Sequence, residues 1–141
     1  ERLNKENGCK IEDFIVLQPT SPLRGAQDID EAISMFLAKK ADSVISYVEE
    51  SHPVIWHKYL DEDGGFENIF DETLSNRQDN RISYYPNGAI MVFKFSLIKS
   101  KRYYSEKSYA YIMPRIRSVD IDCLDDFEYA EYLLEKEYAE I

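Results

Sequence analysis

The chain has 141 residues, a formal net charge of -10 and a pI near 4.7. With 44% hydrophobic residues it can bury a core, but it lacks the basic surface that nonspecific nucleic-acid binding needs. Its apolar runs all fall short of the roughly 20 residues of a membrane span. Cys9 and Cys123 form no metal-binding or disulfide pattern. We therefore expect a cytoplasmic protein with reduced thiols, and neither nucleic acid nor membrane as a partner.

A short apolar run at residues 14–17 predicts a strand that is buried on both faces. The strand should end at Gln18, because Pro19 cannot donate to a sheet ladder. Ligands of open α/β sheets bind beyond the carboxyl ends of the strands. The polar residues that this rule places near a ligand are Gln18, Thr20, Ser21 and Arg24. A strand that merely ends in a turn explains the stretch equally well.

A helix and a second strand follow this turn. Asp28 is a good N-cap, and Glu31 three residues later completes a capping box. The apolar residues at helical spacing, which predict one buried face, are Ile29, Ala32, Ile33, Phe36 and Leu37. Residues 43–48 then predict a strand. Strand, helix and strand in about 35 residues form a βαβ unit, so the two strands should be parallel with a right-handed crossover.

Residues 52–86 change character and predict an excursion from an α/β core made of residues 1–51 and 87–141. Strand-forming segments at 54–60 and 66–70 flank an acidic, glycine-containing turn at 61–65. Residues 71–81 are polar and predict irregular structure. The excursion has more aromatic residues than a free loop needs, so it packs either on the core or on another chain.

The rest of the chain predicts a return to the α/β core. We expect a turn at 86–88, a strand at 89–95, a helical turn at 96–100, a loop to residue 108 and a strand at 109–113. The alternating segment 118–122 leads into a last helix from about residue 124 to residue 138. The apolar face of that helix is predicted to contain Leu124, Phe127, Ala130, Leu134 and Tyr138.

Asp120 and Asp122 are the first candidate for chemistry. Residues i and i+2 of an extended segment point the same way, so the two carboxylates share a face and favour a cation between them. Mg²⁺ is typically held by one or two carboxylates together with substrate phosphates. The alternative is that Asp122 caps the last helix and Asp120 is merely exposed.

The arginines are the second candidate, because a guanidinium group binds carboxylate or phosphate in a bidentate way. They are Arg24, Arg77, Arg81, Arg115 and Arg117. For any single one of them an ion pair with the many acidic residues is the better interpretation. The histidines, His52 and His57, have no nucleophile motif around them and are interpreted as structural.

Three motifs together resemble the acylneuraminate cytidylyltransferases, the CMP-sialic acid synthetases. They are Gln-Pro-Thr-Ser-Pro-Leu-Arg at 18–24, Pro-Asn-Gly-Ala-Ile at 86–90 and Ser-Val-Asp-Ile-Asp at 118–122. The resemblance extends from about residue 12 to residue 135. It implies a Rossmann-like α/β nucleotidyltransferase sheet with a small antiparallel dimerisation excursion, here residues 52–86, and therefore a homodimer.

The resemblance also implies an activity and its residues. The family couples CTP to a nonulosonic (sialic-type) acid, giving the CMP-sugar and pyrophosphate with Mg²⁺ as cofactor. By resemblance Gln18 and Asn87 contact the sugar acid, and Arg77 lies near it across the dimer. Asp120 and Asp122 match the metal-binding and catalytic aspartates. The aromatic pair that lines the sugar pocket corresponds to Tyr103 and Tyr104.

Two departures from the family pattern qualify what is expected. Met91 replaces a tyrosine after the Asn-Gly-Ala motif, which leaves the identity of the sugar acid open. The family's N-terminal nucleotide-binding loop is not in the sequence, so we expect a sheet that is incomplete at its N-terminus and a partial enzyme, inactive alone. The alternative is a non-catalytic dimerisation or sugar-binding fragment. A haloacid-dehalogenase phosphatase also carries Asp-x-Asp, but Leu124 does not fit its motif.

Overall fold

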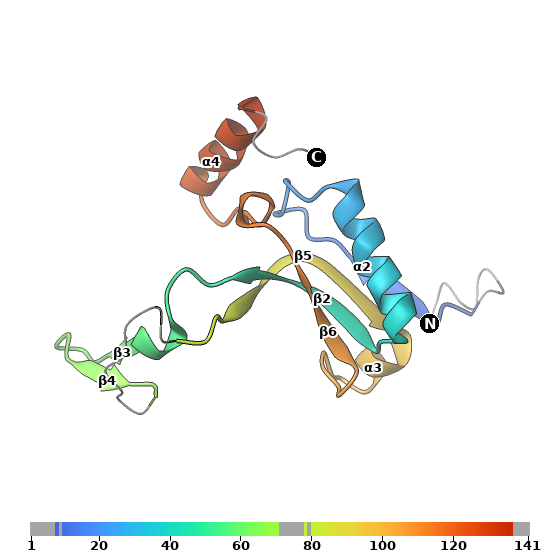
Figure 1. Cartoon of the computed structure of the whole chain (residues 1–141), viewed down its shortest axis with the longest axis horizontal. Helices are drawn as coiled ribbons and strands as arrows, with labels where there is room; N and C mark the ends of the chain where they lie inside the picture. The colour runs from blue at the N-terminus through green and yellow to red at the C-terminus, as the bar shows by residue number, and fades with distance from the viewer. Residues whose placement is uncertain (1–7, 9, 71–77, 79, 137–141) are drawn as a thin grey trace. The chain divides into compact units, whose positions relative to one another are not determined.

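The computed structural model describes residues 8, 10–70, 78 and 80–136 (Figure 1). The chain divides into two compact units, each treated by itself below. We call residues Glu1–Val48 with Pro86–Ile141 the α/β unit, and Glu49–Tyr85 the hairpin unit. A mixed sheet combined with helices confirms the predicted α/β class and is compatible with a Rossmann-like fold.

The main sheet has four strands in the order β1-β5-β2-β6. Their bounds are Asp13–Val16 for β1, Ser43–Glu49 for β2, Tyr84–Lys94 for β5 and Ser108–Ile112 for β6. β1 is antiparallel to β5, and β2 is parallel to β6. The N–H of Lys94 donates to Asp42 and that of Glu50 donates to Ser83, so β5 also runs antiparallel to β2.

The prediction for the first strand is partly wrong. β1 and β2 run in the same direction, as a βαβ unit requires, but β5 lies between them. β1 is an edge strand of the described sheet, and its burial is only partial rather than complete on both faces. The apolar run predicted burial on both faces, but a short run cannot indicate which strands pair beside it.

Helix α2 (Ala26–Lys39) covers one face of the sheet. Ala32 and Phe36 are buried there against Val44 and Ile90, while the predicted face member Leu37 is exposed. The helix begins three residues earlier than predicted, because Gly25 rather than Asp28 is the N-cap, and Asp28 lies in the first turn. Asp28 still caps the helix, since its carboxylate accepts the Gly25 N–H at 2.9 Å.

The opposite face of the sheet holds a second apolar cluster. Ile45, Phe93 and Leu97 are buried there, and Leu97 comes from the short helix α3 (Phe95–Lys99). The predicted helical turn at 96–100 is thus confirmed with a shift of one residue. Phe14 of β1 packs on Phe93 with ring centroids 5.7 Å apart.

Helix α4 (Leu124–Glu135) packs through a face that shares Ala130 with the predicted one but otherwise differs from it. Ala130 and Leu133 are buried against Leu23, whereas Leu124, Phe127 and Leu134 are exposed. The periodicity of α4 fits two apolar stripes, and packing on Leu23 selects the stripe that contains Leu133. Tyr138 lies outside the described residues.

Within its described residues the hairpin unit contains the 3₁₀ turn η1 (Val54–Trp56) and the antiparallel pair β3 (Lys58–Leu60) and β4 (Phe66–Asn68). The strand–turn–strand pattern is confirmed, but residues 54–56 of the first predicted strand form η1 instead, and β4 ends two residues before the predicted end at residue 70. Most of the irregular segment predicted at 71–81, including Arg77, lies outside the described residues. Among the helices that the structure describes, none is long and apolar enough to cross a membrane.

Two other segments differ from prediction. Residues 86–88 are part of strand β5 rather than a turn, and Gly88 has a positive φ of 73°. The segment 118–122 is not a strand. It follows the single 3₁₀ turn η3 (Arg115–Arg117) and precedes α4.

Candidate functional site

The turn after β1 is fixed by buried contacts. Leu23 is fully buried in the cluster under α4, and the N–H of Ser21 donates to Gln18 O at 3.3 Å. Arg24 Nη1 donates to the carbonyl oxygens of Gln18 (3.0 Å) and Ala89 (2.7 Å). Burial lowers the pKa of Arg24. Arg24 therefore joins the turn to β5, which gives this arginine a structural role.

Gly88 brings two predicted site residues together. A β-carbon at this position would collide with Gln18 Oε1 and lie 3.7 Å from Asp120 Oδ2. Only glycine combines the positive φ with this close approach. The segment that carries Asp120 is also tied to the turn, because the Ile121 N–H donates to Thr20 O at 2.8 Å. The three sequence motifs thus meet at one end of the sheet.

Asp120 has an unusual carboxylate. Its Oδ1 atom is buried and, within the part of the chain that the structure describes, has no hydrogen-bond partner; Ser21 Oγ is the other such atom. A buried oxygen of this kind is costly unless a ligand or water completes it. Hard oxygen ligands suit Mg²⁺, so the residues present fit this ion. No group of three or more metal-ligating side chains is found among the described residues, so an ion bound here would also need oxygen ligands from phosphate or water.

Asp122 is exposed and does not cap helix α4. Cys123 is the N-cap residue, and Asp126 accepts the N–H groups of Cys123 (3.0 Å) and Asp122 (3.1 Å). Hydrogen bonds from the Cys123 side chain and from these two N–H groups lower the pKa of Asp126. The alternative role for Asp122 is thus filled by Asp126, which leaves the Asp122 carboxylate to solvent or a ligand.

Asn87 lies beside Gly88 and is only 4% exposed. Its side-chain amide bonds to Ser46 of β2 and to Ser118, two residues before Asp120. The direct contact with a sugar acid that the resemblance implies stays a prediction. Sequence reasoning missed Ser46, although a serine within the apolar strand Ser-Val-Ile-Ser-Tyr-Val is an available signal.

Tyr103 and Tyr104 lie in a loop that hydrogen bonds hold in place. Ser43 Oγ donates to Tyr103 O at 3.1 Å, and the Tyr103 ring packs edge-on against Phe93 at 6.1 Å. A hydrogen bond with Tyr104, together with burial, raises the pKa of Tyr47 to about 12. These contacts are with β2 and β5 rather than with Gln18 or Asp120, so the predicted role of the two tyrosines in the sugar pocket stays a prediction.

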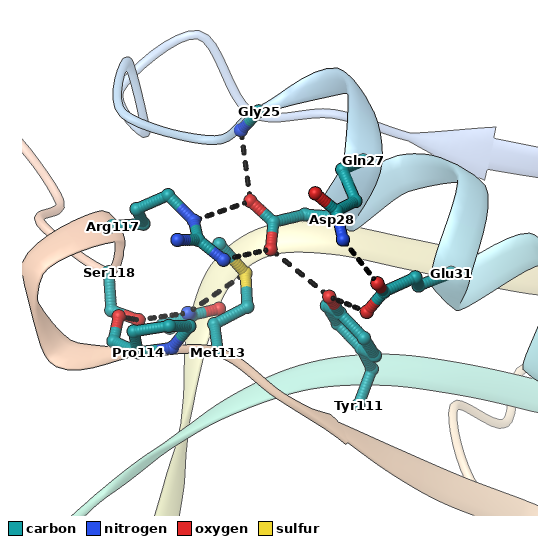
Figure 2. A network of polar contacts seen from close by, with 10 residues as sticks. Gly25, Gln27, Asp28, Glu31, Tyr111, Met113, Pro114, Arg117 and Ser118 are labelled. Carbon is teal, nitrogen blue, oxygen red and sulfur yellow. Dashed lines mark hydrogen bonds and ion pairs between the residues drawn. The ribbon is translucent and has the colours of Figure 1, made fainter. Parts of the chain in front are cut away.

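A buried polar network, not predicted from sequence, lies close to the Asp120 segment (Figure 2). Asp28 accepts two hydrogen bonds from Arg117, both 3.0 Å long, and a third from the Tyr111 hydroxyl at 3.1 Å. Burial alone would raise the pKa of Asp28, but these bonds and the one from Gly25 N hold it below the ordinary value. The same ion pair raises the pKa of Arg117. Arg117 is thus an ion-pair residue, as the sequence favoured.

Comparison with known proteins agrees with the resemblance seen in the sequence. The chain is 36% identical over 118 residues, 82% of its length, to the N-acylneuraminate cytidylyltransferase of Streptococcus agalactiae serotype V. It is 36% identical over 128 residues, 89% of its length, to that of Escherichia coli O18:K1:H7. It spans 29% and 30% of those two curated relatives. No family model matches the chain.

Proposed function

We propose that this chain, which is related to part of the N-acylneuraminate cytidylyltransferases, carries the sugar-side and metal-binding half of a cytidylyltransferase site. The reaction would couple CTP to a nonulosonic acid and release pyrophosphate. One observation carries the proposal: Gln18 and Asp120 meet at Gly88, and Asp120 has a buried, unpartnered oxygen. The residues that bind the CTP phosphates would come from a longer polypeptide, since the chain spans about 30% of its relatives.

The chemistry matches these residue types. The anomeric hydroxyl oxygen of the sugar acid bonds to the α-phosphorus, the α–β phosphoanhydride bond breaks, and the hydroxyl proton passes to solvent or base. Such transfer depends on positioning and charge neutralisation rather than on a covalent nucleophile. Mg²⁺ held by Asp120 and Asp122 would offset phosphate charge when bound. Gln18 can orient hydroxyl and acyl groups without adding charge.

Pyrophosphate release tests this proposal. The assay uses the chain extended at its N-terminus by the matching segment of a relative, with CTP, Mg²⁺ and a panel of nonulosonic acids. We expect release with one sugar acid and a loss of at least about a hundredfold in Asp120→Asn. A folded extended protein that releases none with any sugar acid contradicts the proposal. Calorimetry on the chain alone tests the alternative of a non-catalytic sugar-binding module. If the chain binds the sugar acid while the extended protein releases no pyrophosphate, that alternative is supported.

The hairpin unit is proposed as the contact with a second copy of the chain. Its apolar side chains are unusually exposed, with Phe66 at 81% and Tyr59 and Leu60 above 60%. Surfaces of this kind mark interaction sites more often than free solvent-facing loops. Sedimentation velocity tests the proposal: the wild type should sediment as a dimer and Phe66→Ser should shift toward monomer. A monomeric wild type at about 100 μM contradicts it.

A further inference from the structure

The carboxylate of Asp28 joins two of the three sequence motifs (Figure 2). Its Oδ2 atom accepts from the N–H of Gly25 at 2.9 Å, directly after the motif at residues 18–24. Oδ2 and Oδ1 also accept from Arg117 Nε and Nη2, both at 3.0 Å, directly before the motif at residues 118–122. Capping of α2 requires only the bond from Gly25. The bonds from Arg117 therefore go beyond capping and link the two motif segments.

Asp120 lies between two attachments that hold its segment to residues 18–28. Three residues before it, the guanidinium group of Arg117 binds Asp28 in a bidentate way. One residue after it, the N–H of Ile121 donates to Thr20 O at 2.8 Å. The position of the Asp120 backbone relative to the turn after β1 is therefore set from both sides.

Asp28 is a firm point of attachment. Its side chain is 1% exposed, and the Tyr111 hydroxyl donates to Oδ1 at 3.1 Å, so this group holds the carboxylate together with Gly25 and Arg117. The paired bonds from Arg117 add a directional geometry that a single charge contact lacks. Apolar side chains of similar volume often stabilise a fold as well as a buried ion pair does. The presence of the pair therefore points to a role in fixing one arrangement of the two segments.

We propose that Asp28 and Arg117 are positioning residues for Asp120, because their ion pair fixes the backbone that carries this carboxylate. The inference rests on the proposed function of Asp120 as a metal ligand. Asp120 Oδ1 is buried and has no hydrogen-bond partner within the described residues, so the backbone rather than a bond of its own orients it. Loss of the ion pair should therefore weaken the binding of a divalent cation at Asp120.

A purely electrostatic effect of the pair predicts the opposite sign for one variant. Arg117 is a cation three residues from Asp120, so Arg117→Met would strengthen the binding of a divalent cation if only charge mattered. If the ion pair positions Asp120, the same variant weakens that binding. The double variant Asp28→Asn/Arg117→Met removes the link, keeps the net charge and leaves no unpaired buried charge. Its effect therefore reports the position of Asp120 rather than the local charge.

The test follows Mn²⁺ on the isotope-labelled chain by NMR, with thermal unfolding to show that each variant folds. Mn²⁺ should broaden the backbone signals of residues 120–122 in the wild type. The Mn²⁺ concentration for half-broadening should rise about tenfold in the double variant and in Arg117→Met, the lower end of the effect of losing a residue that orients a metal ligand. Arg117→Lys keeps the charge but loses the bidentate geometry, so it should give a smaller rise of about threefold.

Ile45→Ala is the control for lost stability. Ile45 is buried in the apolar cluster on the sheet face opposite α2, so alanine destabilises the α/β unit without touching the ion pair. At a temperature where both proteins are folded, its half-broadening concentration should equal that of the wild type.

The outcomes separate the proposed function from the positioning role. A wild type with no broadening at residues 120–122 refutes the metal site of the proposed function and the positioning role with it. Wild-type broadening that persists at the same Mn²⁺ concentration in the double variant overturns the positioning role alone, and so does tighter binding in Arg117→Met. An equal rise in Ile45→Ala also overturns it, because the effect then follows from lost stability. If the double variant is unfolded, Arg117→Lys decides in the same way.

Discussion

Replacing Asp28 by asparagine should destabilise the α/β unit strongly. Asparagine keeps an oxygen for the Gly25 N–H but loses the charge that pairs with Arg117. Breaking a buried ion pair by removing one partner typically costs about 3–5 kcal/mol. Asp28 is 1% exposed but the Arg117 side chain is 26% exposed, so water can partly solvate the remaining guanidinium. We therefore expect the lower end of the range, about 3 kcal/mol, or a fall of about 10 °C in Tm.

The measurement is urea unfolding followed by circular dichroism at pH 7. Asp30→Asn is the matched control, because Asp30 is exposed on the same helix and should change stability by less than about 0.5 kcal/mol. A double-mutant cycle that combines Asp28→Asn with Arg117→Met should show a coupling free energy of more than about 1 kcal/mol between the two residues. A loss in Asp28→Asn no larger than that of Asp30→Asn refutes the reasoning.

The pH dependence of stability is a second test of the ion pair between Asp28 and Arg117. The pKa of Asp28 is held below its ordinary value of 3.8, so the stability it contributes is fully present above the unfolded pKa. This contribution is lost as the pH falls through the lower, folded-state pKa. The difference in the free energy of unfolding between wild type and Asp28→Asn should therefore stay constant from pH 7 to about 5 and become smaller below about pH 4.

Three further changes test other parts of the fold. Gly88→Ala should cost about 1–3 kcal/mol in urea unfolding, because alanine is strained at positive φ and would collide with the neighbouring glutamine; an unchanged midpoint contradicts this. Tyr104→Phe should lower the pKa of Tyr47 from about 12 toward 10, read as phenolate absorbance at alkaline pH, and a titration identical to wild type would show that the hydrogen bond is absent. Leu133→Ala should lower the free energy of unfolding by about 2–5 kcal/mol and Leu134→Ala by less than about 1 kcal/mol. Equal losses would contradict the observed packing and favour the predicted face with Leu134.

Local pattern explains which parts of the fold were predictable. The spacing around Ala32 and Phe36 located α2, and the acidic glycine turn located the β3–β4 hairpin. The position of β1 at a sheet edge was not predictable, since strand order depends on contacts between segments about 80 residues apart. The buried face of α4 was ambiguous for the same reason, because only the distant Leu23 selects Leu133 over Leu134.

The candidate site divides in a similar way. Gln18 and Asp120 were predicted from the motifs, and Gly88 lies in the second motif, where its positive φ and its close approach to Gln18 require glycine. The residues that hold these site residues in place by hydrogen bonds were not predictable from the sequence. Ser46 and Ser118 are single hydroxyls whose importance depends on which buried amide they meet, and no spacing rule indicates that.

The place of β1 at the edge of the described sheet has a consequence for how the chain behaves in concentrated solution. A strand with a neighbour on one side presents unpaired backbone groups that another copy could extend. β1 is only four residues long and begins with Asp13, and the chain as a whole carries a charge of -10. Charge repulsion between copies opposes this pairing, but at physiological salt it is screened beyond about 8–10 Å. Colloidal stability should thus be best at neutral pH and low ionic strength, and precipitation should set in on approach to the isoelectric point near 4.7.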